Sequence, residues 1–152
     1  MNAADDSLFL ADADATEAFG ARIAARLGEG DCVCLWGGLG AGKTTFARGA
    51  IRAWTERDEE APSPTFTLVQ TYDGPRGQLW HMDLYRLEDS GQAYELGIEE
   101  ALAAAFCLVE WPDRLGPLLP ADRLDIRLAP DGAGRKAKIE RHGAFLERVD
   151  GF

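Results

Sequence analysis

The stretch GGLGAGKTTF, residues 37–46, places four glycines, a lysine and two threonines between two apolar segments. Glycine inside a regular element costs roughly 0.5–1 kcal/mol relative to alanine, so this spacing implies a special backbone path. Gly37, Gly42, Lys43 and Thr44 match the pattern G-x-x-x-x-G-K-S/T of a phosphate-binding loop, the P-loop. In such a loop successive N–H groups point at phosphate oxygens, and the following helix presents its positive N-terminal end. The stretch therefore predicts a site for the phosphates of a nucleotide.

The segments on either side of the loop have the form that this interpretation requires. Residues 32–36, CVCLW, are a short apolar run typical of a strand buried on both faces. Residues 43–55 contain no helix breaker apart from Gly49 and favour a helix. We expect Lys43 to contact the β- and γ-phosphates and the Thr44 hydroxyl to bind Mg²⁺. The residues expected to line the phosphate site are Gly37, Leu39, Gly40, Ala41, Gly42, Lys43, Thr44 and Thr45.

A second magnesium ligand is predicted at the end of another apolar run. Residues 106–110, FCLVE, indicate a buried strand that ends in the carboxylate of Glu110. P-loop enzymes hold Mg²⁺ with an acid at this place, more often an aspartate, and the longer glutamate can still reach the metal. The alternative is a strand-end acid that faces solvent. The guanine-recognition motif N-K-x-D is excluded because Asn2 is the only asparagine, so ATP is the favoured nucleotide.

The rest of the chain predicts an α/β fold, a single P-loop NTPase-like domain over residues 1–152. A mixed, mainly parallel central sheet is expected, flanked by helices and carrying antiparallel hairpins. A capping box with Asp14 at the N-cap and Glu17 three residues later predicts the start of a first helix, which ends before Gly28. The other expected elements are strands at 66–72, 79–85, 105–109, 124–128 and 137–141 and a helix at 90–105 that breaks at Gly97.

Composition limits the classes of function. The net charge is −10, so a nucleic acid would be held mainly by a partner, because phosphate contacts need a basic face. The cysteines Cys32, Cys34 and Cys107 have no metal-ligand spacing and are interpreted as small buried apolar residues. No apolar run is long enough to span a membrane, and the acidic N-terminal residues differ from a secretion signal. We therefore expect a cytoplasmic protein without a membrane partner.

Several further segments occur in the order found in one protein family. These segments are SPTFTLV (63–69), HMDLYRL (81–87), ELG (95–97) and CLVEWP (107–112). Together with the P-loop stretch they resemble the TsaE family, formerly called YjeE, from about residue 14 to residue 135. One difference is Gly38, at a position where the family usually has aspartate.

The resemblance implies a small bacterial ATPase that is needed to make the threonylcarbamoyl modification of tRNA. In that family the partner is a heterodimer of TsaB and TsaD, of which TsaD transfers the carbamoyl group. ATP hydrolysis by the third protein supports repeated turnover. The tRNA is then contacted indirectly, through the complex. This agrees with the acidic balance of the present chain.

The resemblance also implies roles for individual residues. Lys43 and Glu110 would act in hydrolysis, and Asp83 is similar to the essential acid of the family, which could orient the attacking water. Its alternative role is an ion pair with Arg86, which could itself stabilise transition-state charge. Thr65 resembles a residue that senses the γ-phosphate, with a plain strand-start turn as the alternative.

The resemblance implies three further residues near the nucleotide. Phe9 and Arg135 would approach the base, and Asp113 could reach the site from the segment after the second apolar strand. Trp111 could pack near the nucleotide or belong to the aromatic core. Two other functions stay open: a small-molecule kinase, although no arginine-rich lid segment is visible, and a nucleotide-gated binding module with little turnover.

Overall fold

A computed structural model describes residues 5–64 and 67–148 of the chain. Its strands are β1 (Asp5–Leu10), β2 (Cys32–Trp36), β3 (Val69–Gly74), β4 (Gly77–Asp83), β5 (Phe106–Glu110), β6 (Arg123–Asp131) and β7 (Gly134–His142). Its helices are α1 (Ala13–Arg26), α2 (Lys43–Thr55), α3 (Ser90–Glu95), α4 (Ile98–Ala104) and α5 (Phe145–Arg148), and a 3-10 helix, η1, covers Pro112–Leu118. The predicted strand before the P-loop and the helix after it have the bounds that the sequence indicated.

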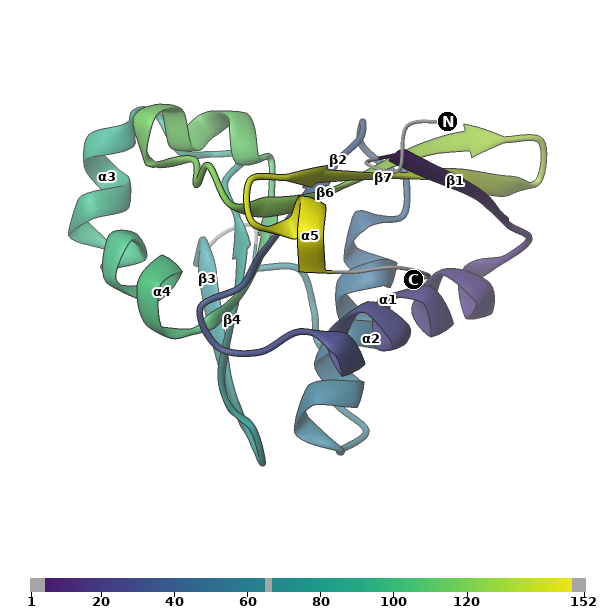
Figure 1. The fold of residues 1–152 in the computed structure, drawn as a ribbon, viewed down its shortest axis with the longest axis horizontal. Helices are drawn as coiled ribbons and strands as arrows, with labels where there is room; N and C mark the ends of the chain where they lie inside the picture. The colour runs from purple at the N-terminus through teal and green to yellow at the C-terminus, as the bar shows by residue number, and fades with distance from the viewer. Residues whose placement is uncertain (1–4, 65–66, 149–152) are drawn as a thin grey trace.

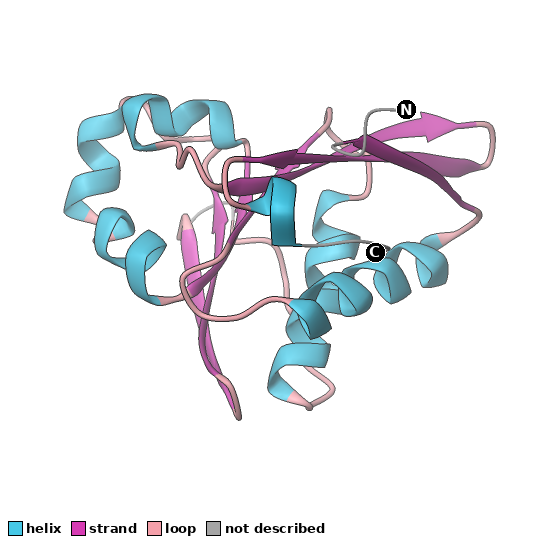
Figure 2. Cartoon of the chain, viewed as in Figure 1, coloured by secondary structure: helices cyan, strands magenta, loops and turns pink. Residues whose placement is uncertain are grey.

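One sheet contains all the described strands, in the order β1-β7-β6-β2-β5-β4-β3. The four central strands, β6, β2, β5 and β4, run parallel to one another. Antiparallel pairs stand at both edges, β3 beside β4 on one side and β7 with β1 beside β6 on the other. The fold is therefore the mixed α/β type that the sequence predicts, with the parallel part in the middle and the hairpins outside (Figure 2).

The sheet separates two apolar layers because neighbouring strand residues face opposite sides. On β2, Val33 and Leu35 pack with α1 and α2, whereas Cys32 and Cys34 pack toward α3, α4 and η1. Figure 1 shows β3 and β4 between the two layers, with α3 and α4 on the left and α1 and α2 on the right. The cysteines are free and buried, as the composition suggested. Burial raises the pKa of Cys107 to about 12, which keeps this thiol neutral.

Helices α1 and α2 cross closely because glycines lie at the crossing. A Cβ on Gly20 would collide with the carbonyl oxygen of Phe46, and one on Gly49 would collide with the carbonyl oxygen of Glu17. The rings of Phe19 and Phe46 meet edge to face at this crossing, 5.4 Å apart. Gly49, the one potential breaker in α2, is thus retained for helix packing. This contact fixes the start of α2, and with it the end of the P-loop.

The predicted N-cap of α1 is wrong by two residues. Asp12, not Asp14, is the cap, and its Oδ1 accepts a hydrogen bond of 2.8 Å from the N–H of Ala15. Asp14 lies in the first turn, where a negative charge favours the positive helix end. Glu17 does not close a capping box, since its carboxylate forms an ion pair of 2.9 Å with Arg52. Glu17, which the local pattern assigned to the capping box, therefore contacts α2 instead.

Three elements were not predicted, namely β1, η1 and α5. The predicted break at Gly97 is confirmed: it has a left-handed φ of 76° and separates α3 from α4. The hairpin strands β6 and β7 are each nine residues long and extend beyond the predicted ranges. No helix in the described ranges combines the length and apolar character that crossing a membrane requires.

Candidate functional site

The P-loop owes its shape to glycines in left-handed or related conformations. Gly37, Gly40 and Gly42 have φ values of 152°, 75° and 103°. A Cβ on Gly37 would lie 2.5 Å from the carbonyl oxygen of Leu128, and Gly42 is the N-cap of α2 without any side-chain cap. The first N–H groups of α2 therefore remain available to a ligand. Gly38 has open space where a side chain would project, so an aspartate or a glycine fits there equally well.

A cavity of about 280 Å³ lies directly over this helix end. Its wall combines the P-loop with the carboxyl ends of β4 and β5 and with one arginine from β7. Strand-end polar groups meet here because the central strands are parallel and end at one edge of the sheet. The lining residues are Leu39, Gly40, Ala41, Gly42, Lys43, Thr44, Thr45, Ser63, Asp83, Glu110, Trp111 and Arg135.

Lys43 places a positive charge in a largely dry part of this cavity. Its side chain is buried, and Nζ donates a hydrogen bond of 2.6 Å to the carbonyl oxygen of Gly37. The same Nζ lies 3.6 Å from the ring centroid of Trp111, a cation–π contact. Burial lowers the pKa of Lys43, and the negative charges of Glu110, Asp83 and Asp113 oppose that shift. Trp111 is therefore part of the site, and its ring holds the lysine in place.

Glu110 does not face solvent, because only 2% of the residue is exposed at the end of β5. The Thr44 hydroxyl lies 3.2 Å and 3.3 Å from the two carboxylate oxygens and donates to them. His81 lies on β4, and its Nε2 is 2.7 Å from Glu110 Oε2. Because the carboxylate accepts, the proton on the His81 ring belongs at Nε2. The structure thus brings together the two residues predicted to bind Mg²⁺.

Asp83 ends the neighbouring strand β4, and its Cα pairs with that of Glu110 in the sheet register. Its Oδ2 accepts a hydrogen bond of 2.8 Å from the Ser63 hydroxyl. Its Oδ1 accepts one of 3.1 Å from the N–H of Tyr85. Only 5% of Asp83 is exposed. The carboxylate is therefore oriented from two sides within the wall of the cavity.

Arg135 is the second residue of β7, and its side chain reaches the P-loop. Its guanidinium donates to the carbonyl oxygens of Ala41 at 3.0 Å and of Gly40 at 2.9 Å. A smaller cavity of about 120 Å³ adjoins the first one and shares Gly42, Thr45 and Arg135 with it. The start of α1 and the β6–β7 hairpin form its other walls. The two cavities therefore adjoin at the N-terminal end of α2.

The sequence model of the family described as threonylcarbamoyl adenosine biosynthesis protein TsaE matches residues 10–138. The chain belongs to the TsaE family. A TsaE protein of Rickettsia bellii is 41% identical over 113 residues, which cover 74% of this chain and 78% of the relative. A TsaE protein of Bacillus subtilis is 39% identical over 112 residues, which cover 73% and 69%.

A solved structure supports the same assignment. The crystal structure of YdiB from Bacillus subtilis aligns with a TM-score of 0.77 and 30% sequence identity. The alignment covers 94% of the present chain and 89% of YdiB. The likeness in fold therefore extends over nearly the whole chain.

Two residues that the TsaE resemblance assigned to the site, Phe9 and Asp113, lie outside the walls of both cavities. Phe9, on β1, is 60% exposed and lies outside both cavity walls, with its ring against Gly134. Asp113 lies outside the walls too, is exposed and is 3.9 Å from Arg114, although its charge acts on Lys43. Thr65 lies outside the described residues.

Sequence reasoning missed two residues of this TsaE site. His81 stands two positions before Asp83, and alternation along a strand puts both on one face, so their spacing was the available signal. Ser63 lies in the segment SPTFTLV, in which the resemblance gave a role to Thr65 alone. Gly37 lies beneath the cavity rather than in its wall, where its carbonyl oxygen holds Lys43.

Proposed function

We propose that this TsaE family member is a magnesium-dependent ATPase of the machinery that makes threonylcarbamoyladenosine in tRNA. The proposal rests on one observation above all: the P-loop threonine and the carboxylate of Glu110, 66 positions apart in sequence, meet in one cavity over a helix N-terminus. An anion cradle alone would suit many phosphorylated ligands. An anion cradle combined with a buried carboxylate–hydroxyl pair suits a nucleotide together with its divalent cation.

The P-loop would hold the phosphate end of ATP. The N–H groups after Gly42 and the aligned peptide dipoles of α2 attract an anion to this point. Lys43 is already directed along the cavity wall by Gly37 and Trp111, so binding exchanges one oxygen acceptor for another. Burial lowers its pKa, and a bound polyphosphate would favour the charged form of the lysine. This lysine would stabilise charge that develops on the γ-phosphate side.

Thr44 and Glu110 fit Mg²⁺, because hard cations take hydroxyl and carboxylate oxygens. When bound, Mg²⁺ would neutralise phosphate charge and fix the geometry of the phosphate oxygens. His81 supports Glu110 from behind, since its Nε2–H occupies one carboxylate oxygen and orients the group. The surroundings of Glu110 are therefore prepared before any ligand arrives. Its side chain has little freedom to lose on binding.

Asp83 would orient the water that attacks the γ-phosphate. The hydrogen bonds from Ser63 and Tyr85 orient its carboxylate, and its register position beside Glu110 brings its backbone next to a proposed metal ligand. A carboxylate in this position accepts a hydrogen bond from water and holds it in line. The bond to Ser63 links Asp83 to the segment that contains Thr65, which we propose as the γ-phosphate sensor.

The smaller cavity would receive the ribose and base. Arg135 bridges the two cavities and can approach the base side while it holds the loop carbonyls. Phe9 lies beside this region, against Gly134, and a modest movement of its exposed ring would cover the base. Asp113 would act at longer range, through its charge on Lys43.

The proposed partners are TsaB and TsaD, as the family suggests, with tRNA contacted through them. The net charge of −10 supports this arrangement, since an acidic protein does not attract the tRNA backbone by itself. We also propose a cytoplasmic location, where tRNA and these partners would be present. We propose that the whole chain is one ATPase domain and that this domain binds the partners.

Phosphate release from ATP, measured with and without purified TsaB and TsaD, tests the proposal. We expect Mg²⁺-dependent release that increases when both partners are present. Absence of release under all these conditions would favour a nucleotide-gated binding module. Depletion of the protein from cells is expected to remove threonylcarbamoyladenosine from tRNA. Normal levels of the modified nucleoside, together with ATP hydrolysis in vitro, would favour a kinase acting on another substrate.

A further inference from the structure

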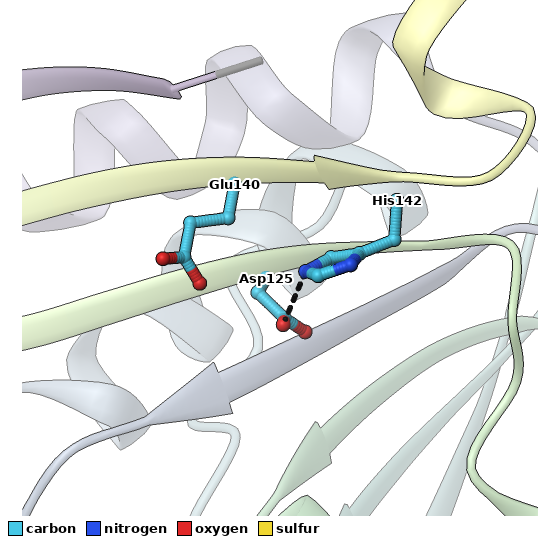
Figure 3. Close-up of side chains that lie close together, drawn as sticks. All are labelled: Asp125, Glu140 and His142. Atoms are coloured by element: carbon cyan, nitrogen blue, oxygen red, sulfur yellow. Dashed lines mark ion pairs between the residues drawn. The ribbon is translucent and has the colours of Figure 1, made fainter.

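A second cluster of metal-ligand residues lies on the β6–β7 hairpin, away from the nucleotide cavity. It consists of Asp125 on β6 and Glu140 and His142 on β7, one ligand atom from each lying within 4.8 Å of the others. Figure 3 shows the three side chains on one side of the hairpin, with the His142 ring directed at Asp125. The sheet register explains the juxtaposition, because Asp125 pairs with Glu140 and His142 lies one alternation further on.

Two atoms of this cluster lack a hydrogen bond although they are close together. Asp125 is fully buried, and its Oδ2 lies 2.9 Å from His142 Nε2. The directions of these atoms do not form a hydrogen bond, and neither has another such partner among the residues that the structure describes. A buried carboxylate oxygen without a hydrogen bond is costly, so such atoms usually have a ligand. The 2.9 Å distance is that of an ion pair. Because neither atom has a hydrogen bond within the described part of the chain, both lone pairs can be directed at a metal ion between the two side chains.

The distance between these atoms, 2.9 Å, is close to that of two ligands on one metal ion. Zinc–nitrogen and zinc–oxygen bonds of about 2.0–2.2 Å put the ligand atoms of a tetrahedral site about 3.3–3.6 Å apart, so a further separation of about half an ångström admits the ion. Glu140 can complete a set of one imidazole and two carboxylates, which suits first-row transition dications better than Mg²⁺. Its side chain and that of His142 are 18% and 37% exposed, so an ion can enter from solvent.

Arginine and lysine side chains beside the cluster bind its two carboxylates and orient them. Arg123 binds the other oxygen of Asp125, Oδ1, at 3.0 Å. Arg127 binds Oε1 of Glu140 at 2.7 Å, while the more distant Lys138 approaches Oε2 at 3.4 Å. Each carboxylate therefore has one firmly bound oxygen, while Asp125 Oδ2 has no hydrogen bond from the described residues and Glu140 Oε2 has the longer contact with Lys138, which a metal ion would displace.

The adjacent thiols do not belong to the ligand set. Cys34 is the β2 neighbour of Asp125 in the sheet register. Among the described residues, the ligand atoms that lie within 4.8 Å of one another come from Asp125, Glu140 and His142 and include no thiol. The chemistry of the cluster is thus that of nitrogen and oxygen donors.

We propose that Asp125, Glu140 and His142 form a binding site for a transition-metal dication such as Zn²⁺, which ties β7 to β6. The site is separate from the nucleotide cavity, since five residues of extended strand, about 16 Å, separate Glu140 from Arg135. On this side of the sheet no described helix covers β6 and β7, whereas α1 and α2 cover the opposite face (Figure 1). Three protein ligands leave at least one coordination position for water.

Titration of the metal-free, full-length protein with Zn²⁺ tests the proposal. Saturating Mg²⁺ and a non-hydrolysable ATP analogue keep the nucleotide site occupied, and binding is followed by calorimetry and by the NMR signals of the histidine rings. We expect one bound Zn²⁺ per chain, a shift of the His142 ring signals and no shift for buried His81. His142→Gln and Glu140→Gln should each weaken binding about tenfold or more.

The variants are chosen to separate loss of a ligand from loss of the fold. His142 and Glu140 are partly exposed, so their substitutions preserve the hairpin better than a change at buried Asp125. Glu147→Gln, an exposed acid on α5, is the matched control and should bind Zn²⁺ like the unchanged protein. Zn²⁺ should also raise Tm of the unchanged protein but not of His142→Gln. Unmoved His142 signals, or equal affinity in His142→Gln, would overturn the proposal.

Discussion

Glu110 and Asp83 end neighbouring parallel strands at paired positions, and the chain supports them in different ways. Glu110 receives its hydrogen bonds from Thr44 on α2 and from His81 on β4, both in regular elements. Asp83 receives one from Ser63, in the loop between α2 and β3, and one from the backbone of Tyr85. A carboxylate held by packed elements suits a fixed ligand, whereas one held by a loop can respond to what the loop contacts.

This difference suggests a division of labour. Glu110 would keep one orientation through the catalytic cycle and hold Mg²⁺. Asp83 would change its surroundings when the segment after Ser63 responds to the γ-phosphate. Substitutions at the two carboxylates, at the lysine that faces both, and at Ser63 should therefore give separable results.

Lys43→Ala should have the largest effect, because Lys43 interacts electrostatically with both carboxylates. Without this charge the γ-phosphate and the two acids repel one another in a poorly solvated cavity. We expect ATP hydrolysis in the presence of TsaB and TsaD to fall about 10³-fold, with measurable loss of ATP-analogue binding. Lys136→Ala, at an exposed lysine of β7, is the control. Unchanged hydrolysis in Lys43→Ala would remove the P-loop from the proposed mechanism.

Glu110→Gln should rank second. The amide keeps the shape and can still accept from Thr44 and His81, but it loses the charge that Mg²⁺ needs. We expect hydrolysis to fall about 10²–10³-fold and the Mg²⁺ concentration for half-maximal rate to rise about tenfold. A magnesium titration of phosphate release measures both. Glu99→Gln, on the exposed side of α4, should behave like the unchanged protein, and a normal magnesium requirement in Glu110→Gln would reassign Glu110 to the fold.

Asp83→Asn should reduce hydrolysis about 10²-fold while nucleotide affinity stays within about twofold. The expected reason is loss of the water-orienting charge, since the amide can still bind Ser63 and the Tyr85 N–H. Single-turnover phosphate release and analogue titration separate these quantities. An equal loss of rate and affinity would contradict the proposed difference between the two strand-end acids.

The parts of the fold that sequence predicted well are those set by local chemistry. The bounds of the P-loop strand and helix follow from a continuous apolar run, a glycine loop and a breaker-free segment. The αL break at Gly97 follows from the residue type itself. The contact between Thr44 and Glu110 was also predictable, because a P-loop pattern and a strand-end acid imply one edge of a parallel sheet.

The parts that sequence missed depend on partners far along the chain. Strand β1 forms by pairing with β7, and its own six residues, DDSLFL, carry little strand signal. The capping choice between Asp12 and Asp14 was decided when Arg52 of α2 bound Glu17. The β6–β7 cluster exists only in one hairpin register, which spacing in sequence does not specify.

Ser63→Ala gives the smallest effect and the sharpest test of the comparison. It removes the hydrogen bond from Ser63 to Asp83 and leaves the bond from Tyr85, so hydrolysis should fall only about fivefold, the equivalent of one ordinary hydrogen bond. Ser7→Ala, at an exposed serine of β1, is the control. If Ser63 acts through Asp83, the double variant with Asp83→Asn should be no slower than Asp83→Asn alone. If the two losses of hydrolysis rate multiply in the double variant, Ser63 and Asp83 act independently. The loop that contains Ser63 would then not orient the Asp83 carboxylate for catalysis.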